Sequence, residues 1–142
     1  MNAGTSGLSI GLPLQSMIVP DGLRYTSDHE WVLITDDTAR VGITDYAQDA
    51  LGDVVFVQLP VLNEIVKSGS SAGEVESTKS VSDIYAPLSG SVSNVNDLLG
   101  DNPQLINADP YGDGWIFEIA LADVSETAAL LDAAAYKALT DG

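Results

Sequence analysis

The stretch Glu76-Ser77-Thr78-Lys79-Ser80-Val81-Ser82-Asp83-Ile84-Tyr85-Ala86-Pro87 joins two extended segments through a short turn with a lysine at its tip. Lys79 is one of only five Lys and Arg residues in a chain of 142. Small polar residues flank this lysine, and β-forming residues lie on either side of the turn. A primary amine in such a turn is accessible to an enzyme that attaches a carrier group. The alternative is an exposed lysine that pairs loosely with a carboxylate, an interaction worth under about 1 kcal/mol.

The composition indicates one acidic globular domain. A chain of 142 residues with 45% hydrophobic and 18% charged residues is long and apolar enough to form a core. Its 21 carboxylates against five cations, a net charge of -16, argue against nucleic acids and anionic membranes as partners. Any protein partner is expected to present a basic face, and a monomer is expected.

The chain lacks the side chains that several kinds of functional site require. The chain has no cysteine, which excludes disulfides, cysteine nucleophiles and thiolate metal sites. His29 is the single histidine, so a multi-histidine metal site is excluded, and no metal is expected. No stretch approaches the roughly 18 apolar residues of a membrane span, and residues 1–23 contain no Lys or Arg for a signal peptide. We therefore expect a bacterial cytoplasmic protein.

The residue pattern predicts a mainly β fold. Residues 1–22 show no periodicity and are expected to form a flexible N-terminal extension, followed by a single domain over 23–142. A hairpin is predicted around Asp36-Asp37, and then a short helix over 45–51 with Thr44 as N-cap and Gly52 at its end. Further strands are predicted near 53–59, 64–67, 71–77, 81–86, 90–95 and 115–121.

Three details of this pattern are specific enough to test. Residues 53–59 are so densely apolar that they predict a central strand buried on both faces. Residues 96–114 are rich in Asn, Asp and Gly and predict loops. Residues 125–139 predict a C-terminal helix with Ser125 as N-cap and a kink near Asp132. Short strands at close spacing favour a sandwich or flattened barrel of antiparallel strands, with one short helix and one C-terminal helix.

A family resemblance follows from five segments in the same order. The stretch Val75–Pro87 looks like the lipoyl-lysine segment of glycine cleavage system H proteins. Four other parts of the chain also resemble that family: Tyr25–Trp31, Val41–Gln48, Leu51–Pro60, and Leu105–Asn107 with Tyr111–Trp115. The resemblance runs from about Gly22 to the C-terminus, and five motifs in register make it specific. It implies the barrel-sandwich hybrid fold of lipoyl and biotinyl carrier domains.

The resemblance also implies a function. In this family (R)-lipoate is bound covalently to the lysine corresponding to Lys79. As a swinging arm it carries an aminomethyl group in glycine catabolism and one-carbon metabolism. The implied partners are a pyridoxal-phosphate glycine decarboxylase, a tetrahydrofolate-dependent aminomethyltransferase, an FAD- and NAD-using dihydrolipoyl dehydrogenase and the enzyme that attaches lipoate. Such a carrier protein is not itself an enzyme. The missing cysteines fit this role, because the dithiolane supplies the sulfur.

Family members dock the loaded arm in a cleft of their own. By position, the candidate lining residues are Glu30, Ile43, Ala47, Leu51 and Asp83, with acids for the ammonium end and apolar residues for the lipoyl chain. Core packing is the alternative role for the three apolar residues. We expect His29 to be structural rather than a general base, because the chain offers it no nucleophile.

Two other functions of a lysine-bearing carrier stay open on the sequence. One is a lipoyl relay protein, or a lipoyl domain that serves another complex of the 2-oxoacid dehydrogenase type. The other is a biotinyl carrier, which usually has Met on both sides of the lysine, whereas here the neighbours are Thr78 and Ser80. An enzyme in its own right would need catalytic residues that this chain does not show.

Overall fold

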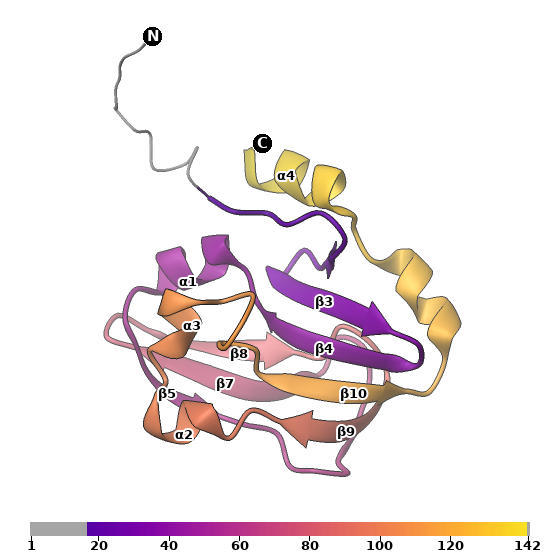
Figure 1. Ribbon diagram of the computed structural model, residues 1–142, viewed down its shortest axis with the longest axis horizontal. Helices are drawn as coiled ribbons and strands as arrows, with labels where there is room; N and C mark the ends of the chain where they lie inside the picture. The colour runs from indigo at the N-terminus through magenta and orange to yellow at the C-terminus, as the bar shows by residue number, and fades with distance from the viewer. Residues whose placement is uncertain (1–16, 142) are drawn as a thin grey trace, which may run out of the picture.

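The computed structural model describes residues 17–141 and contains two antiparallel sheets packed face to face (Figure 1). The larger sheet has six strands, in the order β2 (Arg24–Tyr25), β3 (Glu30–Thr35), β4 (Thr38–Ile43), β10 (Phe117–Leu121), β9 (Gly90–Val95) and β6 (Ile65–Val66). The smaller sheet has three, in the order β5 (Val54–Gln58), β7 (Ser71–Ser77) and β8 (Val81–Tyr85). The predicted antiparallel sandwich is confirmed, and the two sheets do not close into a barrel.

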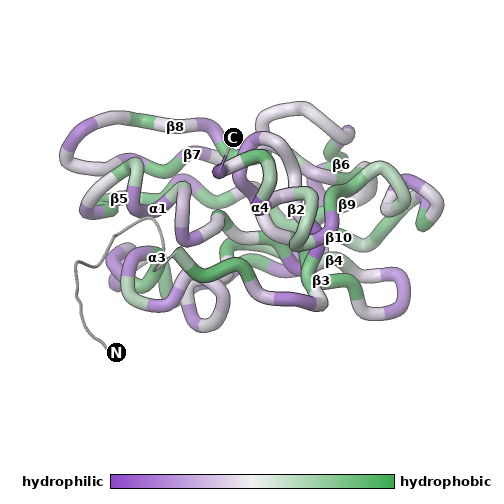
Figure 2. The backbone as a smooth tube through the Cα atoms, turned by 90° about the horizontal axis from the view of Figure 1, so that it is seen from above, coloured by the Kyte–Doolittle hydropathy of each residue, from purple (hydrophilic) through white to green (hydrophobic). Residues whose placement is uncertain are grey.

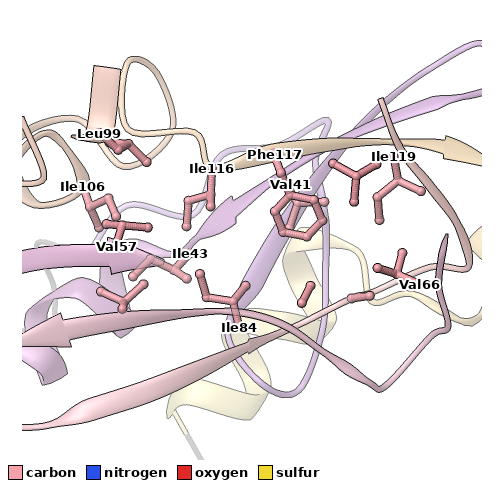
Figure 3. Packing of buried hydrophobic residues seen from close by; sticks show 14 of the residues in the cluster. Val41, Ile43, Val57, Val66, Ile84, Leu99, Ile106, Ile116, Phe117 and Ile119 are labelled. Atoms are coloured by element: carbon pink, nitrogen blue, oxygen red, sulfur yellow. The ribbon is translucent and has the colours of Figure 1, made fainter. Parts of the chain in front are cut away.

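The core lies between the two sheets. Side chains from the smaller sheet, such as Val57 and Ile84, meet Val41, Ile43 and Phe117 from the larger sheet (Figure 3). Two short helices, α2 (Leu98–Asp101) and α3 (Leu105–Ala108), close one end of this core with Leu99 and Ile106, both fully buried. These helices occupy the region 96–114, where the sequence predicted only loops.

The predicted central strand over 53–59 is wrong in its position. β5 lies at an edge of the smaller sheet, and within residues 17–141 its only strand partner is β7. Val55 and Phe56 are 50% and 55% exposed, while Val54 and Val57 are buried. Apolar density therefore did not indicate burial on both faces here, because one face of this sheet is covered by no other part of residues 17–141.

The predicted helix after the first hairpin is confirmed as α1 (Asp45–Leu51). Its N-cap is Thr44, whose side chain accepts a hydrogen bond from the Ala47 N–H, as the sequence predicted. Gly52 follows with φ +81° and ψ -158°, a conformation that requires glycine. α1 lies beside the smaller sheet, next to the tip of the β7–β8 hairpin (Figures 1 and 2).

The C-terminal segment is broken at residues 130–132, close to the kink predicted near Asp132, and is therefore not the continuous helix predicted over 125–139. It contains a 3₁₀ helix, η3 (Val124–Ala129), and an α-helix, α4 (Ala133–Asp141), and Asp123 rather than Ser125 caps the first. The helix is interrupted because Leu131 exchanges two backbone hydrogen bonds of 2.8 Å with Tyr25 of β2. α4 then packs Tyr136 against Tyr25, with ring centroids 4.7 Å apart.

The predicted N-terminal extension falls partly within the described residues. Residues 1–16 lie outside them. The next residues contact the domain: the Ile18 N–H donates to Asp45 Oδ2 at 2.9 Å, and the hydroxyls of Tyr111 and Tyr25 donate to the carbonyls of Ile18 and Pro20. Within residues 17–141, no helix has the length and apolar character needed to cross a membrane.

Gly42 provides a test of the packing behind β3 and β4. A Cβ added at Gly42 would lie 2.5 Å from Trp31 Nε1, and this indole is fixed because its N–H donates to the Pro110 carbonyl at 2.9 Å. Overpacking of this kind costs about 1–3 kcal/mol. We therefore expect Gly42→Ala to lower the free energy of unfolding by that amount in urea denaturation.

Gly100→Ala is the matched control for this substitution. No atom lies within 4 Å of a Cβ added at Gly100, which is in helix α2. Alanine is a better helix former than glycine, so the control is expected to be neutral or stabilising by up to about 1 kcal/mol. Equal losses in the two variants would show that contact with Trp31 is not the constraint at Gly42.

Candidate functional site

Lys79 lies at the tip of the β7–β8 hairpin, in a turn organised by Ser77. The Ser77 N–H donates to the Ser80 carbonyl at 2.8 Å, which closes the turn. The buried Ser77 hydroxyl accepts hydrogen bonds from the backbone N–H groups of Lys79 and Ser80, each at 3.1 Å, and also donates to the Ser80 carbonyl. One side chain therefore satisfies the polar groups of the turn and fixes the backbone on both sides of Lys79.

The turn rests on the corner between α1 and β5. The Thr78 N–H donates to the Asp53 carbonyl at 3.0 Å. A Cβ added at Gly52 would lie 3.0 Å from Lys79 Cε, so the lysine side chain passes closely over this glycine. The sequence predicted Gly52 as a helix end only, and no local signal indicated its contact with Lys79.

The amine of Lys79 is accessible. The side chain is exposed, and the single ion pair within 4.0 Å among residues 17–141 joins Arg40 to Glu118. The carboxylates near Lys79 in sequence, Glu74, Glu76 and Asp83, therefore do not hold its amine in a salt bridge. The residue has the exposure that attachment of a carrier group requires.

A groove of about 340 Å³ begins beside the hairpin and runs between α1 and β8. Ser80 and Val81, which follow Lys79 in the chain, line one end of it. The groove is also lined by all five residues that the sequence proposed for the arm cleft: Glu30, Ile43, Ala47, Leu51 and Asp83. Residues 53 positions apart in sequence thus meet in one groove, although their role toward a bound arm stays a prediction.

The apolar wall of the groove comes mainly from α1. Ala47 and Leu51 are half-buried and pack against the main core, and Ile43 belongs to that core. Cleft lining and core packing are therefore compatible roles for these residues. Tyr46 and Ala50 also line the groove, and sequence reasoning missed them. The i, i+4 spacing of the helix could have identified them. Tyr46 and Ala50 form a pair with this spacing, directly next to the predicted pair Ala47 and Leu51.

The groove is lined by three acids, Asp28, Glu30 and Asp83, in different environments. Asp28 and Asp83 are exposed, whereas the Glu30 side chain is only 2% exposed. The Glu30 carboxylate accepts hydrogen bonds from the Tyr85 N–H at 2.8 Å and the Thr26 hydroxyl at 2.9 Å. Burial raises the pKa of Glu30 from 4.5 to about 7, although these two hydrogen bonds oppose the rise. Glu30 is thus a desolvated acid at a groove wall, with no cation paired to it among the described residues.

His29 also lines the groove and takes part in an aromatic cluster there. Its Nδ1 lies 2.8 Å from the Tyr136 hydroxyl, and its ring stacks on Tyr46 with centroids 4.6 Å apart. The same Tyr136 hydroxyl lies 2.8 Å from Oγ1 of Thr44, the N-cap of α1. Burial lowers the pKa of His29, with Asp28 opposing the change. These contacts agree with the structural role expected for His29, which holds the start of α1 against β3 and α4.

The comparisons with known proteins agree with this site. A family model described as Glycine cleavage H-protein matches residues 23–141. The chain belongs to this family. A glycine cleavage system H protein of Mycobacterium tuberculosis strain H37Rv is 59% identical over 127 residues, which cover 84% of this chain and 94% of that protein. The H protein of Mycobacterium avium strain 104 is 57% identical over 124 residues, with the same coverage of both chains.

A solved structure extends the agreement to the fold. The crystal structure of a glycine cleavage system H protein from Mycobacterium marinum is similar with a TM-score of 0.81 and 46% identity. The similarity covers 87% of this chain and all of that one. The family inferred from five sequence motifs is confirmed, and with it the role of this chain as a carrier in glycine cleavage.

The environment of Glu30 predicts a pH dependence of stability. Between pH 4.5 and 7 the folded state retains a proton on Glu30 that the unfolded chain has released. The free energy of unfolding should therefore fall as the pH rises through this window, by at most about 3 kcal/mol from this group. In Glu30→Gln the Glu30 contribution is absent, so urea denaturation at several pH values should show wild type losing stability relative to this variant. Parallel pH profiles would contradict the ionisation assigned to Glu30.

Proposed function

We propose that Lys79 carries (R)-lipoate through an amide on its Nζ, and that the groove between α1 and β8 receives the loaded arm. The observation that carries this proposal is the position of Lys79, exposed on a fixed turn whose next residues form one end of that groove. The groove has an apolar wall and acidic side chains, which suits an aliphatic chain with a cationic end. An amide on Nζ would replace a cation with a neutral link, so burial of the arm's stem costs less.

The residues of the chain would bind and protect the cargo. When bound, the lipoyl group supplies the sulfur that carries an aminomethyl group. Ile43, Ala47 and Leu51 would contact the arm and exclude water, and Glu30 and Asp83 would face the ammonium end. An ammonium next to Glu30 favours its charged form and lowers its pKa, so docking of the cargo would ionise this buried acid. A desolvated pair of this kind is stronger than a surface ion pair.

The proposal includes the partners and the cellular setting. We infer that the carrier exchanges its cargo with glycine decarboxylase, aminomethyltransferase and dihydrolipoyl dehydrogenase, is modified by a lipoate-attaching enzyme, and works as a monomer in the bacterial cytoplasm. The family membership and the bacterial relatives support this inference. We assign no catalytic residue to the chain, because the groups that face the groove serve binding and protection.

Lys79→Arg tests the attachment site. Arginine keeps the positive charge and approximate length of the side chain but is not a primary amine. We expect wild type co-expressed with a lipoate ligase to gain one lipoyl mass in intact-mass spectrometry, and Lys79→Arg to gain none. Lys67→Arg, at another exposed lysine, is the control and should be modified like wild type. A lipoyl mass on Lys79→Arg would place the modification elsewhere.

Ala50→Trp tests the groove. Ala50 is exposed at the groove wall, so an indole there should occupy the groove without disturbing the core. We expect the aminomethyl group of the loaded variant to be lost at a rate close to that of the same arm on a denatured chain. Ala134→Trp, at an exposed position of α4, should retain the wild-type rate. Equal rates in the two variants would show that the arm is protected at another surface.

A further inference from the structure

The side chain of Asn107 joins three parts of the site without lining the groove itself. Asn107 lies in α3, and its Nδ2 donates to the Gly52 carbonyl and to Gln48 Oε1, each at 2.9 Å. Its Oδ1 accepts a hydrogen bond from the Val54 N–H, also at 2.9 Å. One amide thus uses both of its polar atoms on residues more than 50 positions away in the sequence.

Each of these hydrogen bonds is made to a part of the chain that positions either the Lys79 turn, where the proposed arm begins, or the groove, where it is proposed to dock. Gln48 belongs to α1, the helix whose Ala47 and Leu51 form the apolar wall. Gly52 and Val54 flank Asp53 at the corner between α1 and β5. The Asp53 carbonyl accepts the Thr78 N–H of the hairpin, and Gly52 lies against the side chain of Lys79. Asn107 therefore connects the groove wall and the base of the Lys79 turn through a single side chain.

The corner needs this support because its backbone is not part of regular structure. Gly52 has φ +81° and ψ -158°, a conformation that ends α1, and its carbonyl is outside the helical hydrogen-bond pattern. β5 begins only at Val54, so its first N–H would also lack a partner without Asn107. An amide is the side chain that donates to the carbonyl and accepts from the N–H at the same time.

We propose that Asn107 is a positioning residue for the carrier: it sets the α1–β5 corner so that the Lys79 turn and the groove wall stay aligned for the arm to dock. This inference rests on the proposed docking of the arm in the groove. The hydrogen bonds of the Asn107 side chain go to Gln48, Gly52 and Val54, and Asn107 does not line the groove, so its effect is transmitted through Gly52, Asp53 and Gln48. Without it the turn is still formed by Ser77, but its place relative to α1 is no longer fixed.

The test uses full-length lipoylated protein loaded with the aminomethyl group. The variants are Asn107→Ala and Asn107→Asp; the latter keeps the acceptor for Val54 but replaces the donor to Gly52 with an oxygen. Asn94→Asp is the matched control, because the exposed Asn94 also accepts a backbone N–H, from Val95, and donates to an acidic acceptor, Glu118. We expect both Asn107 variants to lose the aminomethyl group roughly tenfold faster than wild type, since Asn107→Asp removes the two donated hydrogen bonds and Asn107→Ala removes all three.

Hydrogen exchange separates positioning from general destabilisation. The Thr78 amide, bonded to Asp53, should exchange faster in the Asn107 variants, whereas the Ile116 amide, bonded to the Val41 carbonyl in the core, should not change. Acceleration of both amides by the same factor would overturn the inference, and so would a wild-type rate of aminomethyl loss in the Asn107 variants.

The failure of the docking proposal is distinguishable from the failure of this inference. If loaded wild type lost the aminomethyl group as fast as a denatured lipoylated chain, the docked arm would be overturned and the inference with it. If wild type and Asn94→Asp protect the cargo, and the Asn107 variants protect it equally, the inference alone is overturned.

Discussion

The pairing register of β7 and β8 is the constraint on which the site depends. Because side chains alternate across a strand, the register that buries Val75 against the core also buries Ser77 and exposes Glu74 and Glu76. A shift by one residue would expose Ser77, and the turn would lose the hydroxyl that satisfies its backbone. The core between the two sheets therefore fixes the orientation of the turn that carries Lys79.

The groove is a consequence of how the smaller sheet meets α1. Gly52 ends α1 and turns the chain into β5, which pairs with β7 and so brings the hairpin back beside the same helix. In the proposed docking, the arm's attachment point and its docking wall are linked by a few residues of local chain and by one strand pairing. Asn107 holds the corner on this short path, which is why we propose a positioning role for it.

The sequence predicted most of this arrangement where a local rule applied. Thr44 and Gly52 follow capping preferences, the hairpin around Asp36-Asp37 follows turn preferences, and Lys79 was marked by its flanking residues. The pattern failed for β5, because the apolar residues Val55 and Phe56 carry no information about which sheet will cover them. It also failed at Leu131, whose pairing with Tyr25 is a contact between distant segments that ends a locally favourable helix.

The same distinction, between features set by local sequence and features set by tertiary structure, applies to the site residues. Glu30 and Asp83 could be proposed by family position, but nothing local distinguishes a buried acid from an exposed one. Their difference arises from tertiary structure: Glu30 lies between β4 and the Tyr85 backbone, while Asp83 faces solvent. Asn107 was part of a recognised motif, yet its partners lie in α1 and at the start of β5 and could not be read from the motif.

The charge distribution bears on the proposed binding of an ammonium in the groove. Because the protein has a net charge of -16, its whole surface attracts an ammonium, and attraction alone does not select a site. A specific binding site for the ammonium requires a carboxylate that is desolvated and whose charge is costly to leave without a partner. Glu30 meets both conditions. Because Glu30 has two neutral donors when the groove holds no cation, the empty carrier is not destabilised by a fully unsatisfied carboxylate. A buried acid with a pKa close to neutral can therefore alternate between a protonated state and a paired, ionised state at small cost.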